Sequence, residues 1–310
     1  MHAASFHSSP VRDAPARRIA CIIACTAVIA AACGPLTARC DWPTYRHDER
    51  RSGATPEACD PAALGVAWTH ATGTPPRTAW AGAAKYDAFA RVLGLKSMRN
   101  YDPVFHPVIA DGKLLYGSSV DHGVHCLDAA TGKTLWTFTT GGPVRIAPAV
   151  VDGVAYVGAD DGVLRALALD DGRELWRFSP VATPGRVIHE GNCISLWPCR
   201  TGALVVGDTV YAAFSLLPWK RSSLVAVDRR TGTPGDGGFV RELDAVTLEG
   251  PLLATSTQVL CPQGRIAPLA FARDDGRPLG TLPGGGGCAV VIGDDGRVFH
   301  GPGNKAGEFY

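Results

Sequence analysis

Residues 127–138 read LDAATGKTLWTF, and residues 167–178 read LALDDGRELWRF. Each stretch places a turn glycine four residues before a tryptophan. The corresponding pairs are Gly132 with Trp136 and Gly172 with Trp176, which lie 40 residues apart. Self-similarity at a period of about 20 to 50 residues is the signature of architectures built from stacked structural repeats. A unit of this kind cannot bury its apolar faces alone and therefore packs on its neighbours.

The similarity extends beyond the two quoted stretches. Residues 106–138 align with residues 147–178, and the offset stays close to 40 throughout. This alignment predicts that Tyr116 and Tyr156 occupy equivalent places in adjacent units.

Turn signals divide each unit into four short apolar runs. In the second unit the signals are the Asp-Gly pairs at 152–153, 161–162 and 171–172. Asp-Gly between β-rich runs is a strong hairpin signal, because the tight turn needs positive φ, which glycine adopts without steric cost. Four short antiparallel strands in about 40 residues are typical of one β-propeller blade. We therefore predict an all-β propeller of four-stranded antiparallel blades.

The two repeated tryptophans have a structural interpretation in this fold. Each falls in the fourth strand, from which its ring can lie across the neighbouring blade and cover the turn there. Full burial of such a ring contributes on the order of 3 kcal/mol. The alternative is that Trp136 or Trp176 stacks on a ligand, which the recurrence of the position in both units disfavours.

Further units are less regular. The segments 202–232 and 250–280 repeat the theme, and Gly280 takes the tryptophan position in the later unit. A last partial unit begins at Gly287, and the segment from Asp41 to His70 is expected to contribute a closing strand. We count five or six blades or part-blades. Two alternatives stay open, a closed ring and a truncated member of a longer propeller.

The N-terminus has the features of an export signal. Arg17 and Arg18 precede the run 19–33, IACIIACTAVIAAAC, in which only Thr26 is polar. The run is shorter than the roughly 20 apolar residues of a membrane span, but it has the length and flanks of a signal-peptide core.

The cleavage site has two readings. Ala30 and Ala32 form an A-x-A site, and a second site follows Ala38. We predict a signal peptide over 1–38 or, if a lipid is attached to Cys33, a lipoprotein leader that ends at residue 32. The propeller is expected over 39–310, in the periplasm or outside the cell, with no transmembrane span in the mature chain.

Composition excludes some partners and limits the role of cysteine. Lys and Arg number 30 against 29 Asp and Glu, so no basic surface for nucleic acid is expected. Of ten cysteines, Cys193 and Cys199 are the predicted disulfide, because they lie six residues apart in one irregular loop. Cys126, Cys261 and Cys288 lie in apolar runs and are predicted to be buried.

These motifs resemble the PQQ-like β-propeller repeat proteins, the superfamily of the quinoprotein alcohol dehydrogenase propeller and of the outer-membrane assembly lipoprotein with the same fold. The resemblance rests on the runs at 128–136 and 170–176. Further segments, at 41–55, 117–132, 142–150 and 191–202, are similar to those of secreted propellers from bacteria such as planctomycetes.

The resemblance implies a cofactor, pyrroloquinoline quinone with Ca²⁺, held between a tryptophan and two adjacent cysteines. The sequence has no adjacent cysteine pair and no matching series of Glu, Asn and Asp. Asp160-Asp161 and Asp294-Asp295 offer oxygen ligands for Ca²⁺, but they directly precede turn glycines, which hairpin formation explains. We therefore expect no cofactor and no metal, with the quinone and calcium as the alternative.

One insertion carries candidate binding residues. Residues 184–202, PGRVIHEGNCISLWPCRTG, lie between the fourth strand of one blade and the first of the next. Loops at a propeller rim place binding residues on a rigid scaffold. The candidate ligand residues are His189, Asn192, Trp197 and Arg200 of this insertion, together with Arg145. The alternative is a loop whose polar groups satisfy its own backbone.

The sequence thus favours an exported, non-catalytic propeller that serves as a protein-interaction or ligand-binding scaffold. Its expected partner is a protein or a small ligand. No catalytic residue is assigned, because Ser195 and His189 lack an acid to complete a triad. The alternative function is a quinone-dependent dehydrogenase or a degenerate relative of one, and enzymatic activity is left open.

Overall fold

The computed structural model describes residues 41–58, 60–74, 84–87, 92–95, 105–189, 191–263, 266–284, 286 and 290–301. The predicted leader, with Cys33, and the predicted buried Cys288 lie outside the described residues.

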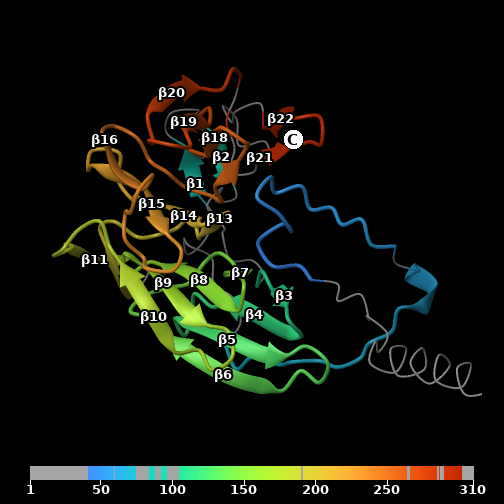
Figure 1. Cartoon of the computed structure of the whole chain (residues 1–310). Helices are drawn as coiled ribbons and strands as arrows, with labels where there is room; N and C mark the ends of the chain where they lie inside the picture. The colour runs from blue at the N-terminus through green and yellow to red at the C-terminus, as the bar shows by residue number, and fades with distance from the viewer. Residues whose placement is uncertain are drawn as a thin grey trace, which may run out of the picture. The chain divides into compact units, whose positions relative to one another are not determined.

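Four complete sheets confirm the predicted fold class. Each is a four-stranded antiparallel meander whose strands pair in chain order (Figure 1). The first sheet contains β3 (Val108–Ala110), β4 (Lys113–Gly117), β5 (Gly123–Asp128) and β6 (Thr134–Thr139). The second contains β7 (Ala149–Val151), β8 (Val154–Ala159), β9 (Val163–Ala168) and β10 (Glu174–Phe178). The third contains β13 (Leu204–Val206), β14 (Thr209–Phe214), β15 (Ser222–Asp228) and β16 (Phe239–Leu243), and the fourth contains β17 (Leu253–Ala254), β18 (Gln258–Cys261), β19 (Leu269–Ala272) and β20 (Pro278–Thr281).

Three further pairs of strands accompany the complete sheets. They are β1 (Ala84–Asp87) with β2 (Val92–Leu95), β11 (Arg186–His189) with β12 (Asn192–Ser195), and β21 (Val290–Ile292) with β22 (Val298–His300). A short 3₁₀ turn, η1, covers Pro61–Ala63. No helix among the described residues is long and apolar enough to cross a membrane.

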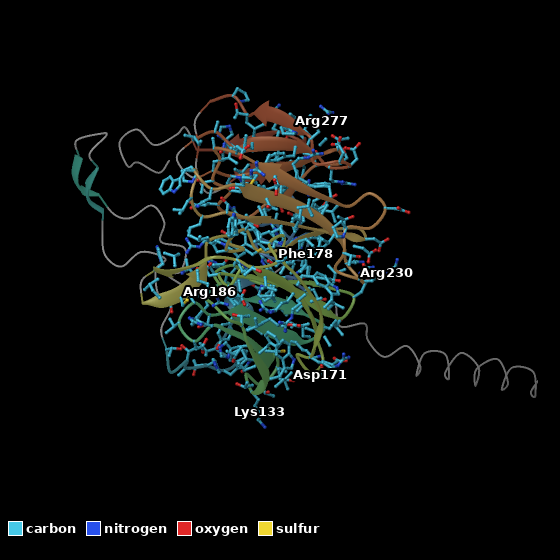
Figure 2. All side chains as sticks on the ribbon, turned by 90° about the vertical axis from the view of Figure 1, so that its left-hand side faces the viewer. Lys133, Asp171, Phe178, Arg186, Arg230 and Arg277 are labelled. Atoms are coloured by element: carbon cyan, nitrogen blue, oxygen red, sulfur yellow. The ribbon has the colours of Figure 1, made fainter. Side chains whose placement is uncertain are left out.

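The meander gives the packed sheets two distinct faces. Connections from first to second and from third to fourth strands lie at one end of each sheet, which we call the turn face. Connections from second to third strands and from one sheet to the next lie at the other end, the loop face. Asp171 and Arg230 belong to the turn face and Arg186 to the loop face, and Figure 2 shows them toward opposite sides of the view.

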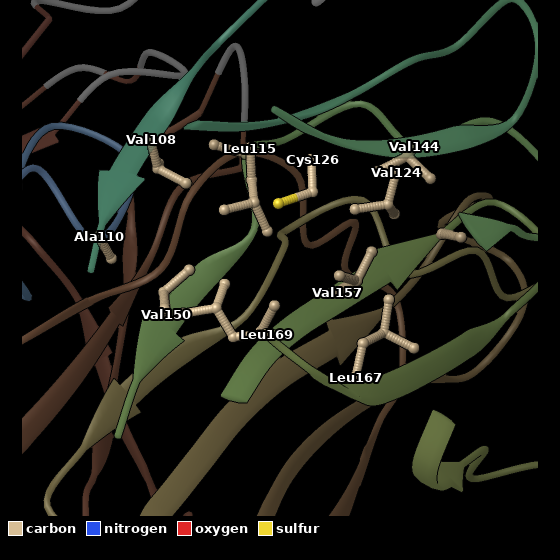
Figure 3. Packing of buried hydrophobic residues seen from close by; sticks show 13 residues of the cluster. Val108, Ala110, Leu115, Val124, Cys126, Val144, Val150, Val157, Leu167 and Leu169 are labelled. Atoms are coloured by element: carbon tan, nitrogen blue, oxygen red, sulfur yellow. The ribbon is translucent and has the colours of Figure 1, made fainter. Parts of the chain in front are cut away.

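Adjacent sheets bury apolar side chains against each other. In the first two sheets Leu115 and Cys126 pack with Val150, Val157 and Leu167, all nearly inaccessible to solvent (Figure 3). Comparable clusters join the second sheet to the third and the third to the fourth. Each sheet is therefore buried against its neighbour by a separate apolar cluster, as the repeat predicts.

The predicted role of the repeated tryptophans is confirmed. Trp136 of β6 lies over Gly172 of the second sheet, and its indole N–H donates to the Leu169 carbonyl at 2.9 Å. Trp176 of β10 covers Gly232 of the third sheet in the same way.

The same position recurs with variations. Phe239 of β16 covers Gly276, and Trp68, from the segment before the first sheet, covers Gly132. Gly280 pairs with Ala270 of the third strand, and the aromatic residues hold the same register in their own sheets. Gly280 therefore takes the tryptophan position of its sheet, as predicted.

The predicted equivalence of Tyr116 and Tyr156 is wrong. Tyr156 pairs with Ala166 of the next strand, and Leu115 holds the same register with Cys126. Leu115 is therefore equivalent to Tyr156. Tyr116 lies on the opposite face of its sheet, because successive side chains of a strand alternate.

The two tyrosines are out of register because the β4–β5 connection is one residue longer than the β8–β9 connection. Gly117 pairs with Val124 across the β4–β5 connection, and Gly158 pairs with Leu164 across the β8–β9 connection. The offset between the repeats is thus 41 before the connection and 40 after it. A slip of one residue in a strand moves every side chain to the other face.

The segment from Asp41 crosses the first strands instead of closing a sheet. Trp42 exchanges two backbone hydrogen bonds with Ile109 of β3, and the Pro43 carbonyl accepts from Val150 of β7. Further along, the Glu49 and Arg50 carbonyls accept from the first strands β17 and β21. The segment therefore connects the first strands of four sheets.

Arg51 anchors this segment in the interior. Its guanidinium donates to the Leu252 carbonyl at 2.9 Å and to the Thr44 hydroxyl at 2.8 Å. Burial lowers the pKa of Arg51 to about 10, which leaves the side chain charged at neutral pH.

Candidate functional site

The insertion between the second and third sheets lies on the loop face. It forms the β11–β12 hairpin where the sequence predicted an irregular loop. His189 pairs with Asn192 next to the hairpin turn, and Arg186 pairs with Ser195 at the base. The insertion is thus a defined structural element that projects from the sheets.

Arg145 and Arg200 meet on one carboxylate. Each lies four residues before the first paired residue of its sheet, so the two positions are equivalent. The Nε atom of Arg145 donates to Asp160 at 2.8 Å, and Arg200 donates to the same carboxylate through Nε at 3.1 Å and Nη2 at 3.0 Å. The structure therefore brings two of the five candidate residues together.

This triad is buried, so it has a structural role. The side chains of Arg145, Asp160 and Arg200 are 4%, 1% and 1% exposed. Burial alone raises the pKa of Asp160, but the charges of Arg200 and Arg145 outweigh it and lower the pKa. Removing one member of such a network leaves an uncompensated charge, at a cost of about 3–5 kcal/mol.

The neighbouring carboxylate has its own arginine. Asp161 accepts two hydrogen bonds from Arg165, at 3.1 and 2.6 Å, and a third from the Gly141 amide at 2.9 Å. Fork-like pairing of this kind fixes both position and orientation. The Asp160-Asp161 pair, in the β8–β9 connection, therefore links the loops on either side of it, which lead into β7 and into β13.

Other contacts connect the insertion to the first and third sheets. The Asn192 side chain lies 3.0 Å from the ring of His122, in the β4–β5 connection. The indole N–H of Trp197 donates to the Arg221 carbonyl, in the β14–β15 connection, at 2.6 Å. These candidate residues hold the hairpin in place, and His189 lies partly buried on β11.

The structure corrects the predicted disulfide. Cys193 and Cys199 are both free thiols, the first exposed and the second buried. Cys199 follows the hairpin and packs against Gly158 of the second sheet, whereas Cys193 lies on β12. Formation of the hairpin separates the two side chains, which short sequence spacing could not show. Cys126 and Cys261 are buried, as predicted.

A family profile described as outer membrane protein assembly factor BamB matches residues 58–241, more than half of the chain. The chain belongs to this family. A BamB protein from Yersinia pestis is 32% identical over 134 residues, which cover 41% of this chain and 31% of that protein. The chain therefore aligns with about a third of the length of this curated BamB relative.

Solved structures with this fold include two dehydrogenases. A europium-containing methanol dehydrogenase has a TM-score of 0.53 and 14% identity, with 83% of this chain and 53% of that chain covered. The quinohemoprotein alcohol dehydrogenase from Comamonas testosteroni has a TM-score of 0.56 and 17% identity, with 87% and 48% covered. At these identities the likeness shows the propeller fold that this BamB-family chain shares with them.

That fold raises the question of a quinone and a calcium ion. The acidic pair Asp160-Asp161 does not fit a cation, because three arginines already neutralise its carboxylates. Within the described ranges, no group of three or more His, Cys, Asp or Glu residues is placed to hold a metal. Of the two acidic pairs that the sequence offers for Ca²⁺, Asp160-Asp161 is therefore already paired with arginines in this BamB-family chain.

The exposed side chains of the loop face are apolar at several points. Ile188 on the hairpin is 71% exposed and Trp219 in the β14–β15 connection is 75% exposed. Val187 and Ile266 on the same face are also exposed. These residues were not among those predicted from the sequence, although the position of Trp219 between two strands, beside Pro218 and Lys220, is a signal for an exposed loop.

Proposed function

We propose that this protein is an exported, non-catalytic interaction scaffold whose loop face binds a protein partner. The observation that carries the proposal is the pair of exposed apolar side chains, Ile188 and Trp219, on elements that side-chain hydrogen bonds connect to neighbouring loops. Exposed aromatic and aliphatic residues on a rigid support are typical of binding surfaces.

A backbone hydrogen bond at the base of the β11–β12 hairpin supports this role. Ser195 at the end of β12 donates its amide to the Asp160 carbonyl at 2.8 Å, so the hairpin base is bonded to the residue that carries the buried arginines. A preorganised element loses little conformational freedom on binding. The scaffold therefore presents Ile188 in a fixed position.

Membership of the BamB family supports a protein partner, since the family is described as an outer membrane protein assembly factor. We propose periplasmic or extracellular residence on the basis of the leader over 1–38, with a lipid on Cys33 as the alternative. Mass spectrometry of the native mature protein tests this part. A chain beginning near residue 39, or a diacylglyceryl-modified Cys33, supports export, and an intact Met1 contradicts it.

Site-specific photocrosslinking in the producing cell tests the binding face. A benzophenone amino acid replaces Ile188 or Trp219 on the loop face. Val240, which is 43% exposed on the outer strand β16, is the matched control. We expect a discrete adduct with one protein from Ile188 and Trp219 and none from Val240. Equal adducts at all three positions, or none on the loop face, would contradict the proposal.

The non-catalytic part of the proposal has a separate test. Purified protein is incubated with pyrroloquinoline quinone and Ca²⁺, and its absorption and dye-linked alcohol oxidation are recorded. We expect neither a shifted quinone band nor turnover, because the described acidic pair is neutralised by arginines. Alcohol oxidation that requires both additives would replace the scaffold by a quinone-dependent dehydrogenase.

A further inference from the structure

A groove on the turn face lies between the third and fourth sheets, on the opposite end from the proposed partner site. Its volume is about 550 Å³, within the range of small-molecule pockets, roughly 300–1,000 Å³. Strand β14, the β17–β18 turn and the β19–β20 turn line it. Its lining includes Thr209, Tyr211, Ser256, Thr257, Arg273 and Arg277.

The repeat identifies the counterpart of Arg273. Its amide donates to the Thr257 carbonyl at 2.9 Å, as the Arg229 amide donates to the Asp208 carbonyl at 2.9 Å. The Tyr211 hydroxyl donates to the Arg273 carbonyl at 3.0 Å. In the sheet before, a tyrosine hydroxyl donates to the Arg229 carbonyl at 3.2 Å. Arg273 and Arg229 therefore occupy equivalent positions.

At Arg229 two carboxylates, one from each neighbouring sheet, pair with the guanidinium. The guanidinium donates to Asp152 of the second sheet at 2.7 Å and to Asp208 of the third sheet at 3.0 Å. These two hydrogen bonds raise the pKa of Arg229.

At Arg273 both carboxylates are missing. The register of the first two strands makes Gly207 equivalent to Asp152, and the backbone bonds make Thr257 equivalent to Asp208. The Arg273 guanidinium donates instead to the Thr255 carbonyl at 3.1 Å. Within the part of the chain that the structure describes, Arg273 forms no ion pair. An arginine therefore remains at this position without the two carboxylates, and it lines the groove.

Other groups at the groove suit an anion with several oxygens. Arg277 brings a second guanidinium, which is 64% exposed. Its contact with Asp275 is loose, with 3.9 Å between the nitrogen and the carboxylate oxygen. Ser256, Thr257 and Thr209 supply hydroxyl donors, and Asp274 is the acidic residue of the lining. Arginine binds carboxylates through two parallel hydrogen bonds.

We propose that this groove binds a carboxylate-bearing small molecule. The carboxylate of this ligand pairs with Arg273 as Asp152 and Asp208 pair with Arg229. The groove is thus a ligand site that is separate from the loop face.

Titration of the full mature chain with succinate and citrate, followed by ligand-observed NMR, tests the proposal. We expect saturable binding that Arg273→Gln weakens at least tenfold. Arg230→Gln, on an exposed arginine of the same face that lies outside the groove lining, is the control and leaves the affinity unchanged.

Thr257→Asp provides a second variant that keeps Arg273. It introduces a carboxylate at the position equivalent to Asp208, so we expect it to pair with Arg273, to abolish carboxylate binding and to raise the unfolding midpoint. Carboxylate binding that survives both Arg273→Gln and Thr257→Asp would overturn the site. Inorganic phosphate that competes with equal affinity would overturn the assignment to carboxylates, and so would the absence of saturable binding by the unmodified chain.

Discussion

Trp136 lies against Gly172 so closely that a methyl group on the glycine would come within 2.6 Å of the indole ring. Gly172 also has φ of +74°, a conformation that residues with a Cβ rarely adopt. One glycine therefore forms the turn of its own sheet and makes room for the ring of the previous sheet. The quoted repeat, in which glycine and tryptophan recur four residues apart, encodes this contact between neighbours.

Substitution of Gly172 by alanine tests the contact. Gly153 is the matched control, because its φ is +73° and no atom lies within 4 Å of the position of an added Cβ. Gly153→Ala is expected to cost only the strain of the left-handed conformation, about 1–2 kcal/mol. Gly172→Ala is expected to cost about 1–3 kcal/mol more, because the methyl group overlaps the ring. Urea unfolding measures both, and equal losses would contradict the packing.

Asp160→Asn tests the buried triad on the loop face. The substitution keeps the shape of the side chain but leaves the buried Arg145 and Arg200 without their carboxylate. We expect a loss of about 3–5 kcal/mol in the free energy of unfolding. Asp171→Asn, at an exposed turn, is expected to cost less than about 1 kcal/mol. A small effect at Asp160 would show that the triad is not buried as described.

The same carboxylate predicts a pH dependence. The folded-state pKa of Asp160 lies below its ordinary value, so the unfolded chain binds more protons near pH 4. The stability from Asp160 is therefore complete above about pH 4 and is lost as the pH falls through the folded-state pKa. Unfolding midpoints between pH 6 and pH 3 should fall less steeply in Asp160→Asn than in the unmodified chain. Parallel slopes would contradict the ion pairing.

Thiol labelling tests the corrected cysteine assignment. The exposed Cys193 should react with an aromatic disulfide reagent in the folded protein. Cys126 should not react, because burial raises its pKa to about 11. Cys193→Ser should thus remove one rapidly reacting thiol, while Cys199→Ser should remove none. If Cys193 and Cys199 were instead linked, the unmodified chain and Cys193→Ser would show the same fast amplitude. The intact mass of the unmodified chain would then be two hydrogens below that of the fully reduced chain.

The sequence predicted the parts of the fold that are encoded locally. Asp-Gly turns and alternating apolar runs specify four strands per unit, and the fixed distance from Gly132 to Trp136 specifies the stacking aromatic residue. Phe239 was missed because the β15–β16 connection is longer, so counting from its turn glycine fails. The Tyr116 error has a similar origin, since one added residue in a loop changes the face of a strand.

The sequence predicted residues of the candidate site but not which of them contact one another. Arg145 and Arg200 were selected as residues near the propeller mouth, and the structure brings them together. Their shared partner Asp160 could not be identified from the sequence, because Asp-Asp-Gly already has an explanation as a turn. Exposure of Ile188 likewise depends on the hairpin that the insertion forms, which its irregular composition did not indicate.

The most direct test of the stacked-sheet account is a double-mutant cycle between Trp136→Ala and Gly172→Ala, with unfolding free energies measured in urea. If the indole ring occupies the space over the turn glycine, the extra cost of Gly172→Ala relative to Gly153→Ala disappears once the ring is removed, and the coupling energy is about 1–3 kcal/mol. Additive losses in the double variant would show that Trp136 and Gly172 do not touch, and would contradict the packing of each sheet on the next.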